Sequence, residues 1–188
     1  MQLNSRVTRE DLQSRAAAVQ MLLMDVDGVL TSGHLYLVPD GNGGMAETKG
    51  FDSQDGIALR WLSWYHIKTG VISGRNSPAT VERARQVDMS YVYQGHIEKI
   101  PILEEILRDS GIAAEHVAYV GDDLTDTVLM RRVGISFATA NARQEVKQVA
   151  MATTDARGGS GAVREVIEFL LQSKGIWEEL LKKYEVIA

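Results

Sequence analysis

Two aspartates close an apolar run near the start of the chain. Residues 21–24 are apolar, and Asp25, Val26, Asp27 and Gly28 follow them. Two buried carboxylates this close together repel each other and lose hydration, so a cation is expected beside them. Mg²⁺ takes oxygen ligands and commonly keeps one or two carboxylates together with phosphate oxygens of a substrate. The pair therefore indicates a metal site that handles phosphate, although the pair alone also fits an ordinary strand followed by an Asp-Gly turn.

Three further stretches carry groups that suit phosphate chemistry. A strand-like segment ends in Ser73-Gly74, a helix-like segment begins at Lys99, and a second strand-like segment ends in Asp122-Asp123, with Asp126 one helical turn later. Transfer of a phosphoryl group needs donors and cations around the phosphoryl oxygens and a proton for the leaving oxygen. Each stretch alone is more often a loop, a surface lysine or a solvated helix residue. Only their order along the chain makes them informative.

Elements that alternate between strand and helix patterns connect these stretches. Expected strands cover residues 21–25, 67–74, 91–93, 117–121, 135–137 and 151–154, and expected helices cover residues 8–18, 53–65, 76–86, 99–109, 124–133, 143–149, 161–173 and 176–184. This alternation predicts an α/β fold with a doubly wound, Rossmann-like parallel sheet, in which ligands bind at the carboxyl ends of the strands. We therefore expect the chemistry-bearing stretches to meet at one edge of the sheet.

A β-hairpin is expected directly after the aspartate pair. Two extended runs, 34–38 and 45–49, flank a dense cluster of turn residues at 39–44. This pattern is typical of a hairpin, which would form a small flap over about residues 33–50 beside the site. No segment of the chain has room for a large cap domain. We expect a single domain over residues 1–188 with an apolar C-terminal tail at about 175–188.

Composition excludes several classes of protein. The chain has 188 residues, 45% of them hydrophobic and 24% charged, with a net charge of −5 and no cysteine. Disulfides, thiolate metal sites and cysteine nucleophiles are excluded, and an acidic chain disfavours nucleic-acid binding. No run approaches the length of a membrane span or the apolar core of a signal peptide, so we expect no membrane partner and a cytoplasmic location. The four histidines show no spacing typical of metal ligands.

The ordered set of motifs resembles the haloacid dehalogenase superfamily of phosphotransferases. The motifs are DVDGVLT at 25–31, ISGR at 72–75, Lys99 and GDDLTD at 121–126. The resemblance spans about residues 21–165. It implies that Asp25 is the nucleophile that becomes an aspartyl phosphate, and that Asp27 protonates the leaving oxygen and then activates water.

The same resemblance implies roles for the other stretches. Mg²⁺ would be held by Asp25, the backbone carbonyl of Asp27 and Asp122. Lys99 would bridge Asp25 and the phosphoryl group, whose oxygens would also bind Ser73 and the amide of Gly74. The acidic residues Asp123 and Asp126 are expected behind this first layer, with Asp126 orienting Lys99 or water molecules on the metal.

Within the superfamily the chain resembles the 3-deoxy-D-manno-octulosonate 8-phosphate phosphatases, which act in lipopolysaccharide precursor biosynthesis. The resemblance rests on the capless build, DSQDG at 52–56, Gln94-Gly95 and GGSGAVRE at 158–165. It implies a homotetramer in which a neighbour's flap and C-terminal tail complete each site. Ser160 stands where those enzymes often have a basic residue, which leaves some substrate contacts open.

Two arginines bear on which sugar acid phosphate would be the substrate. Related enzymes that cleave nine-carbon sugar acid 9-phosphates tend to have glutamate after the Ser-Gly pair, and this chain has Arg75 there. A guanidinium can bind a substrate carboxylate through two hydrogen bonds. Arg157, beside the glycine loop, is a second candidate for this contact. Either arginine could instead be a structural ion-pair partner.

Four alternatives stay open at this point, three for the activity and one for the tail. The substrate could be a nine-carbon sugar acid 9-phosphate. A receiver domain of a signalling relay also uses an acidic cluster, a phosphorylated aspartate, a hydroxyl residue and a lysine, but it lacks an acid at the position of Asp27 and has no use for a flap. A non-catalytic homologue is disfavoured because every catalytic position is filled. The tail could pack against its own body instead of a neighbour's site.

Overall fold

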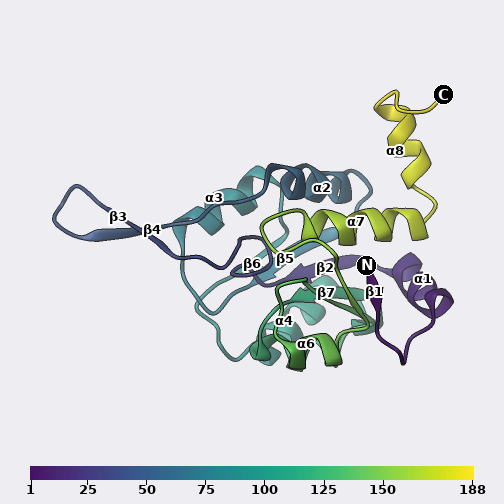
Figure 1. Cartoon of the computed structure of the whole chain (residues 1–188), viewed down its shortest axis with the longest axis horizontal. Coiled ribbons are helices and arrows are strands. Elements are labelled where there is room, and N and C mark those ends of the chain that lie inside the picture. The colour runs from purple at the N-terminus through teal and green to yellow at the C-terminus, as the bar shows by residue number, and fades with distance from the viewer.

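A seven-stranded sheet lies between two layers of helices in the computed structural model, which describes residues 1–188 (Figure 1). All neighbouring strands are parallel except β1, which pairs antiparallel with β9 at one edge. The strand order is β1 (Gln2–Leu3), β9 (Ala152–Thr153), β8 (Ile135–Ala138), β7 (Val117–Gly121), β2 (Met21–Met24), β5 (Lys68–Ile72) and β6 (Tyr91–Tyr93). The predicted doubly wound α/β sheet is confirmed, and only the two-residue strand β1 was not expected.

The central strand β2 shows why these segments read as continuous apolar runs. Leu22 and Met24 pack into the core on one face, whereas Met21 and Leu23 pack into the core on the other. Successive side chains of a strand point to opposite faces, so a strand covered on both sides must be apolar at every position. The run ends at Asp25 because the sheet ends there and the carboxyl edge begins.

Helices cover both faces of the sheet (Figure 1). One layer contains α1 (Arg9–Ala18), α2 (Ser53–Trp64), α3 (Pro78–Gln86) and α7 (Ala162–Ser173), and the other contains α4 (Ile100–Ser110), α5 (Thr127–Met130) and α6 (Gln144–Val149). The hydroxyl of Thr8 accepts a hydrogen bond from the amide of Asp11 at 3.1 Å, which caps α1 as its sequence predicts. The helices all fall short of the length and apolar character that crossing a membrane requires.

The helix expected over 124–133 is shorter than predicted. The segment forms the 3₁₀ turn η2 (Leu124–Asp126) and then the four-residue helix α5. The cause is the carboxylate of Asp126, which accepts hydrogen bonds from the backbone amides of Asp122 and Asp123 at 2.9 and 3.1 Å. These bonds draw the first turn tight against the end of β7, which favours 3₁₀ over α geometry.

The predicted hairpin is present and projects from the body (Figure 1). Strands β3 (Tyr36–Pro39) and β4 (Met45–Thr48) pair antiparallel, and Asp40 holds the turn by accepting hydrogen bonds from the amides of Asn42 and Gly44. We call residues 33–50 the flap. Its large apolar side chains are exposed, namely Leu35, Tyr36, Leu37, Val38 and Met45.

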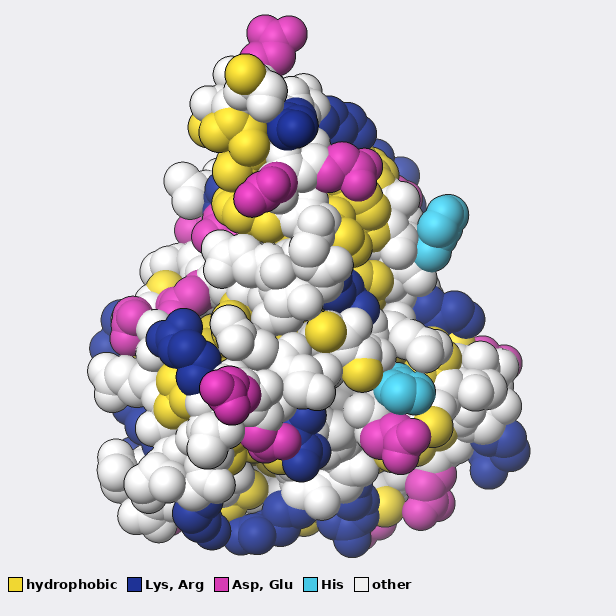
Figure 2. Space-filling model, turned by 90° about the vertical axis from the view of Figure 1, so that its right-hand side faces the viewer, with side chains coloured by type: hydrophobic (Ala, Val, Ile, Leu, Met, Phe, Trp, Pro, Cys, Tyr) yellow, Lys and Arg dark blue, Asp and Glu magenta, His cyan; other side chains and the backbone are white.

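The C-terminal tail packs on its own body. Helix α8 (Trp177–Lys183) follows α7 and lies at the opposite end of the molecule from the flap (Figure 1). A second 3₁₀ turn, η1 (Ala114–His116), leads into β7. Trp177 contacts Trp61 edge to face with ring centroids 6.0 Å apart, and the Trp61 indole donates a hydrogen bond to the Tyr184 hydroxyl at 3.0 Å. Figure 2 shows hydrophobic side chains exposed around this segment. Within one chain, the tail therefore stays away from the carboxyl edge of the sheet.

Candidate active site

The stretches singled out in the sequence meet in one cavity of about 310 Å³ at the carboxyl edge of the sheet. Strand β2 leads into Asp25 and Asp27, strand β5 into Ser73 and its neighbours, and strand β7 into Asp122. The cavity is lined by Asp25, Asp27, Gly33, Ser73, Gly74, Arg75, Ile97, Lys99, Asp122, Asp123 and Thr125. Of the candidate residues, Asp126 lies behind this lining and Arg157 lies outside it.

Lys99 is buried in the floor of the cavity. Its side chain is 2% exposed, and its ammonium lies 2.7 Å from Asp126 and 3.1 Å from Asp25. The hydroxyl of Tyr119 also donates a hydrogen bond to Asp126, at 2.7 Å. The predicted contact between Asp126 and Lys99 is thus present. Since Asp126 also binds the amides at the start of η2, one fully buried carboxylate ties the lysine to the loop that carries Asp122.

Asp25, Asp122 and Asp126 form an acidic cluster, with carboxylate oxygens that lie within 4.8 Å of one another. Burial raises the pKa of Asp122 to about 8, reinforced by the negative charges of Asp126 and Asp25. Burial and Asp126 also raise the pKa of Asp25, to about 6, against the opposing effect of Lys99. One carboxylate oxygen of Asp122 is buried without a hydrogen-bond partner. Three carboxylates facing one lysine leave an excess of negative charge and free oxygens, which fits a divalent cation with oxygen ligands.

Gly28 allows the chain to pass close to this cluster. It adopts a positive φ of 87°, and a Cβ atom built there would lie 2.0 Å from a carboxylate oxygen of Asp122. A side chain at this position would therefore collide with Asp122 in addition to straining the backbone. The observed position of the Asp122 carboxylate therefore requires glycine at residue 28.

Asp27 points away from the acidic cluster and toward the flap. Its side chain pairs with the ammonium of Lys49, and its second oxygen lies 4.0 Å from Nε of Arg75. Glu47 joins the two cations, since its carboxylate lies 3.2 Å from Lys49 and accepts a hydrogen bond from Arg75 at 2.6 Å. The hydrogen bond from Arg75 is the main cause of the lowered pKa of Glu47. We call Asp27, Glu47, Lys49 and Arg75 the flap network.

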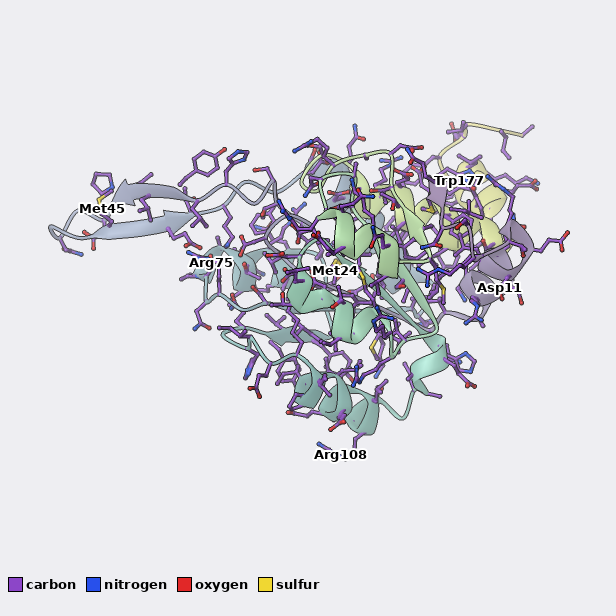
Figure 3. The ribbon with its side chains drawn as sticks, turned by 60° about the horizontal axis from the view of Figure 1, so that its bottom comes forward. Asp11, Met24, Met45, Arg75, Arg108 and Trp177 are labelled. Atoms are coloured by element: carbon purple, nitrogen blue, oxygen red, sulfur yellow. The ribbon has the colours of Figure 1, made fainter.

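Lys49 and Glu47 were not among the residues singled out from the sequence. The available signal was their spacing, because residues two apart on a strand face the same side, and both lie in the second run of a hairpin that was itself expected. In Figure 3, Arg75 lies on the side of the body from which the flap extends to Met45, whereas Trp177 lies at the opposite end. The flap stem therefore contributes charged groups to the edge of the cavity.

The remaining candidates have local partners. The buried hydroxyl of Ser73 accepts a hydrogen bond from the amide of Arg75 at 3.2 Å, and Gly74 lines the cavity beside Ile97. The carboxylate of Asp123 accepts a hydrogen bond from the amide of Leu124 at 2.8 Å, so it is engaged in capping η2. Its side chain serves the turn that carries the cluster.

Arg157 forms no ion pair and does not line the cavity, but its loop supports the Asp27–Gly28 segment. The amide of Gly159 donates a hydrogen bond to the carbonyl of Val29 at 2.9 Å. A Cβ atom at Gly158 would lie 1.9 Å from the carbonyl oxygen of Gly28. The glycine loop thus packs backbone against backbone on the outer side of the site.

Comparison with known proteins gives a consistent picture. A family model described as haloacid dehalogenase-like hydrolase matches residues 75–167. The chain is 37% identical over 169 residues to the 3-deoxy-D-manno-octulosonate 8-phosphate phosphatase KdsC of Escherichia coli (strain B / BL21-DE3), which covers 90% of this chain and 88% of that protein. The residues that the family model matches include Arg75, Ile97, Lys99, Asp122, Asp123 and Thr125 of the cavity lining.

Two solved structures of enzymes with the same description share the fold. The phosphatase of Moraxella catarrhalis, in complex with magnesium ion, phosphate ion and a KDO molecule, superimposes with a TM-score of 0.89 at 31% identity, over 94% of this chain and 99% of that one. The phosphatase of Yersinia pestis gives a TM-score of 0.86 at 36% identity, over 90% of this chain and 89% of that one.

Proposed function

Because the chain belongs to the haloacid dehalogenase-like hydrolases, we propose that it hydrolyses 3-deoxy-D-manno-octulosonate 8-phosphate to KDO and phosphate in a Mg²⁺-dependent reaction, as a step in lipopolysaccharide precursor biosynthesis. The main structural support for this reaction is that Asp25, Asp27, Ser73 and Lys99 line one cavity, and that Asp25 also belongs to the acidic cluster. The similarity to KdsC over 90% of the chain supports the substrate. Membership of a hydrolase family favours release of the phosphoryl group over the storage that a receiver domain performs.

Asp25 is proposed as the nucleophile. Its carboxylate attacks phosphorus, the bond from phosphorus to the sugar oxygen breaks, and an aspartyl phosphate forms. Asp27 gives a proton to the leaving oxygen and then takes one from the water molecule that hydrolyses the aspartyl phosphate. The two side chains face different surroundings, since Asp25 contacts Lys99 and Asp27 contacts the flap network.

Cationic and neutral donors offset the charge of the phosphoryl group. Lys99 lies 3.1 Å from Asp25 and lines the cavity, so its ammonium can contact both the nucleophile and a bound phosphoryl oxygen. The hydroxyl of Ser73 and the amide of Gly74 lie at the end of β5 on the same cavity wall and are proposed to donate hydrogen bonds to that group.

Mg²⁺ is proposed to bind at the acidic cluster. Asp25, Asp122 and the backbone carbonyl of Asp27 would hold it, and it would neutralise charge on the phosphoryl oxygens. Asp126 is proposed as a positioning residue, since both of its oxygens are occupied by Lys99, Tyr119 and backbone amides. Asp123 acts through the turn that it caps.

Arg75 is proposed to bind the carboxylate of the sugar acid. It is the arginine that lines the cavity, and its present partner, Glu47, is an acid that a substrate carboxylate can replace. Arg157 would need a movement of its loop to make such a contact. A nine-carbon sugar acid 9-phosphate is the alternative substrate, because it carries the same phosphate and carboxylate groups at a different separation.

We further propose that the chain works as a homotetramer in which flaps and tails of neighbours complete each site. The support is the exposed apolar surface of the flap, where five large side chains face solvent in the single chain. A tail that packs on its own body through Trp177 leaves residues 185–188 as the part that could reach a neighbour. The apolar residues Val186 and Ile187 in this segment are exposed.

The decisive test is steady-state release of phosphate from a set of sugar phosphates in the presence of Mg²⁺. We expect the highest kcat/KM with the eight-carbon 8-phosphate, and no activity in Asp25→Asn or after removal of Mg²⁺ with a chelator. A strong preference for a nine-carbon 9-phosphate would replace the substrate assignment. Rapid turnover by Asp25→Asn would overturn the mechanism. Sedimentation of the wild type and of a chain that ends at residue 184 tests the tetramer and the tail.

A further inference from the structure

The side chain of Lys49 is buried although the residue sits at the stem of a projecting flap. Only 1% of its side chain is exposed. It follows directly after β4, and its ammonium lies between the carboxylates of Asp27 and Glu47. A lysine gives up hydration and side-chain freedom when it is buried, and the carboxylates of Asp27 and Glu47 offset this cost. Lys49 thus contacts Asp27, a residue of the cavity lining. A surface lysine that only kept the protein soluble would not need to be buried in this way.

The two oxygens of Asp27 have different surroundings. Oδ1 is engaged by Lys49. Oδ2 is buried, accepts no hydrogen bond, and lies 4.0 Å from the Arg75 guanidinium nitrogen Nε. Asp27 lines the same cavity as Asp25 and Ser73. One oxygen of the carboxyl group is therefore fixed by the flap, and the other is left without a partner next to the reaction space.

We propose that Lys49 is a positioning residue for the proton transfer by Asp27. This inference rests on the proposed function, in which Asp27 protonates the leaving oxygen. By occupying Oδ1, Lys49 fixes the rotation of the carboxyl group so that Oδ2 carries the proton. That proton passes from Oδ2 to the sugar oxygen as the bond from phosphorus to that oxygen breaks. Oδ2 later accepts a proton from the attacking water, and Lys49 keeps all of its protons throughout.

Glu47 keeps Lys49 in place. Its carboxylate lies 3.2 Å from Lys49. In the free enzyme it also accepts a 2.6 Å hydrogen bond from Arg75, and when a substrate carboxylate takes Arg75, Lys49 is the cation that Glu47 retains. The charges of Glu47, Lys49 and Asp27 alternate in sign. A general acid contributes to catalysis only when its proton is within reach of the leaving atom. Because these ion pairs fix the carboxyl group of Asp27, the flap stem affects the rate of the proton transfer.

The test compares two leaving groups in the full-length, Mg²⁺-loaded enzyme. The sugar alkoxide of the 8-phosphate needs a proton to depart, whereas p-nitrophenolate departs without one. Release of each leaving group is measured in a single turnover, which isolates the step before hydrolysis of the aspartyl phosphate. The variants are Lys49→Met, which removes the charge at similar length, and Lys49→Arg, which keeps it. Thr48→Ala, a change at the exposed last residue of β4 next to Lys49, is the matched control.

For Lys49→Met we expect the sugar rate to fall about 10- to 100-fold, part of the range that general acid catalysis contributes, and the p-nitrophenyl rate to change less than about threefold. Lys49→Arg should keep the ratio of the two rates within about threefold of the wild type, and Thr48→Ala should match the wild type. Equal losses on both substrates, or no loss on either, would overturn the inference. If Lys49→Met does not fold, Glu47→Gln replaces it, with the same selective loss at a smaller size expected.

Asp27→Asn separates this inference from the proposed function. If Asp27→Asn loses the sugar rate and Lys49→Met does not, only the role of Lys49 is refuted. If Asp27→Asn retains the sugar rate, the assignment of Asp27 as the acid is refuted, and the inference about Lys49 falls with it.

Discussion

The two sides of the cavity differ in the balance of their charges. On the side of β7, the acidic cluster places three carboxylates around the single ammonium of Lys99, and burial raises the pKa of both Asp25 and Asp122. On the side of the flap, two carboxylates meet two cations, and the pKa of Glu47 is lowered by Arg75. The side of β7 therefore carries excess negative charge, which a further cation would have to balance. The side of the flap is neutral by itself, so its ion pairs can hold the Asp27 side chain in one orientation.

The largest expected effect is that of replacing Lys99, whose side chain is buried in the acidic cluster. Lys99→Met removes the only cation of the acidic cluster, so we expect a loss of phosphate release of at least about 10³-fold, comparable to removal of a key donor to a developing charge. The metal-free variant should also lose about 3 kcal/mol or more of its free energy of unfolding, because a buried carboxylate pair is left uncompensated. Steady-state assays and urea unfolding measure both. A loss no greater than that of Lys49→Met would show that the two sides do not differ.

The acidic cluster also predicts a dependence of stability on pH. The pKa of Asp122 is about 8 in the folded protein against an ordinary value of 3.8, so between these values the folded protein holds a proton that the unfolded chain has released. The free energy of unfolding of the metal-free protein should therefore decrease as the pH rises through this window. Between pH 6 and pH 8.5 we expect a decrease on the order of 2 kcal/mol relative to Asp122→Asn.

Urea unfolding of both proteins at several pH values, without metal, measures this difference. Mg²⁺ should stabilise the wild type more at pH 8.5 than at pH 6, because a metal ion binds the ionised carboxylates and competes with their protons. A difference between wild type and Asp122→Asn that does not change with pH would contradict the raised pKa of Asp122.

A smaller effect is expected for the cation at the outer end of the flap network. Arg75→Met removes the proposed partner of the substrate carboxylate, so KM for the sugar acid phosphate should rise about tenfold while kcat changes less than about threefold. The KM for p-nitrophenyl phosphate, which has no carboxylate, should stay close to that of the wild type. A fall in kcat with an unchanged KM would instead give Arg75 a part in the chemical step.

The smallest expected effect is on the stability of the flap network. In Glu47→Gln, Arg75 is half exposed to solvent and Lys49 is still paired with Asp27. The free energy of unfolding should therefore change by less than about 1 kcal/mol, as is usual for ion pairs near the surface. Urea unfolding, with Lys99→Met measured in parallel, gives the comparison. A loss as large as that of Lys99→Met would mean that the flap network is part of what holds the body together.

Much of the fold and of the site could be predicted because both depend on local patterns. The apolar runs that become β2, β5 and β7 are buried on both faces, so each reads as a strand and ends where polar residues begin. Parallel strands then bring Asp25, Ser73 and Asp122 to one edge without further information. Elements that depend on distant contacts were harder to predict. Strand β1 has two residues and no pattern of its own, and the helix after β7 is shortened by the hydrogen bonds of Asp126.

By itself, the sequence determined the order of strands and helices, the edge at which the site forms, and the residue types available for phosphate chemistry, because these follow from the period of apolar residues and the rules of parallel sheets. Only the tertiary structure decided which charges pair. It placed Lys49 and Glu47 beside Asp27, left Arg157 outside the cavity, and packed α8 against Trp61. Such pairings depend on distances of a few ångströms between segments far apart in the chain, and no local pattern encodes them.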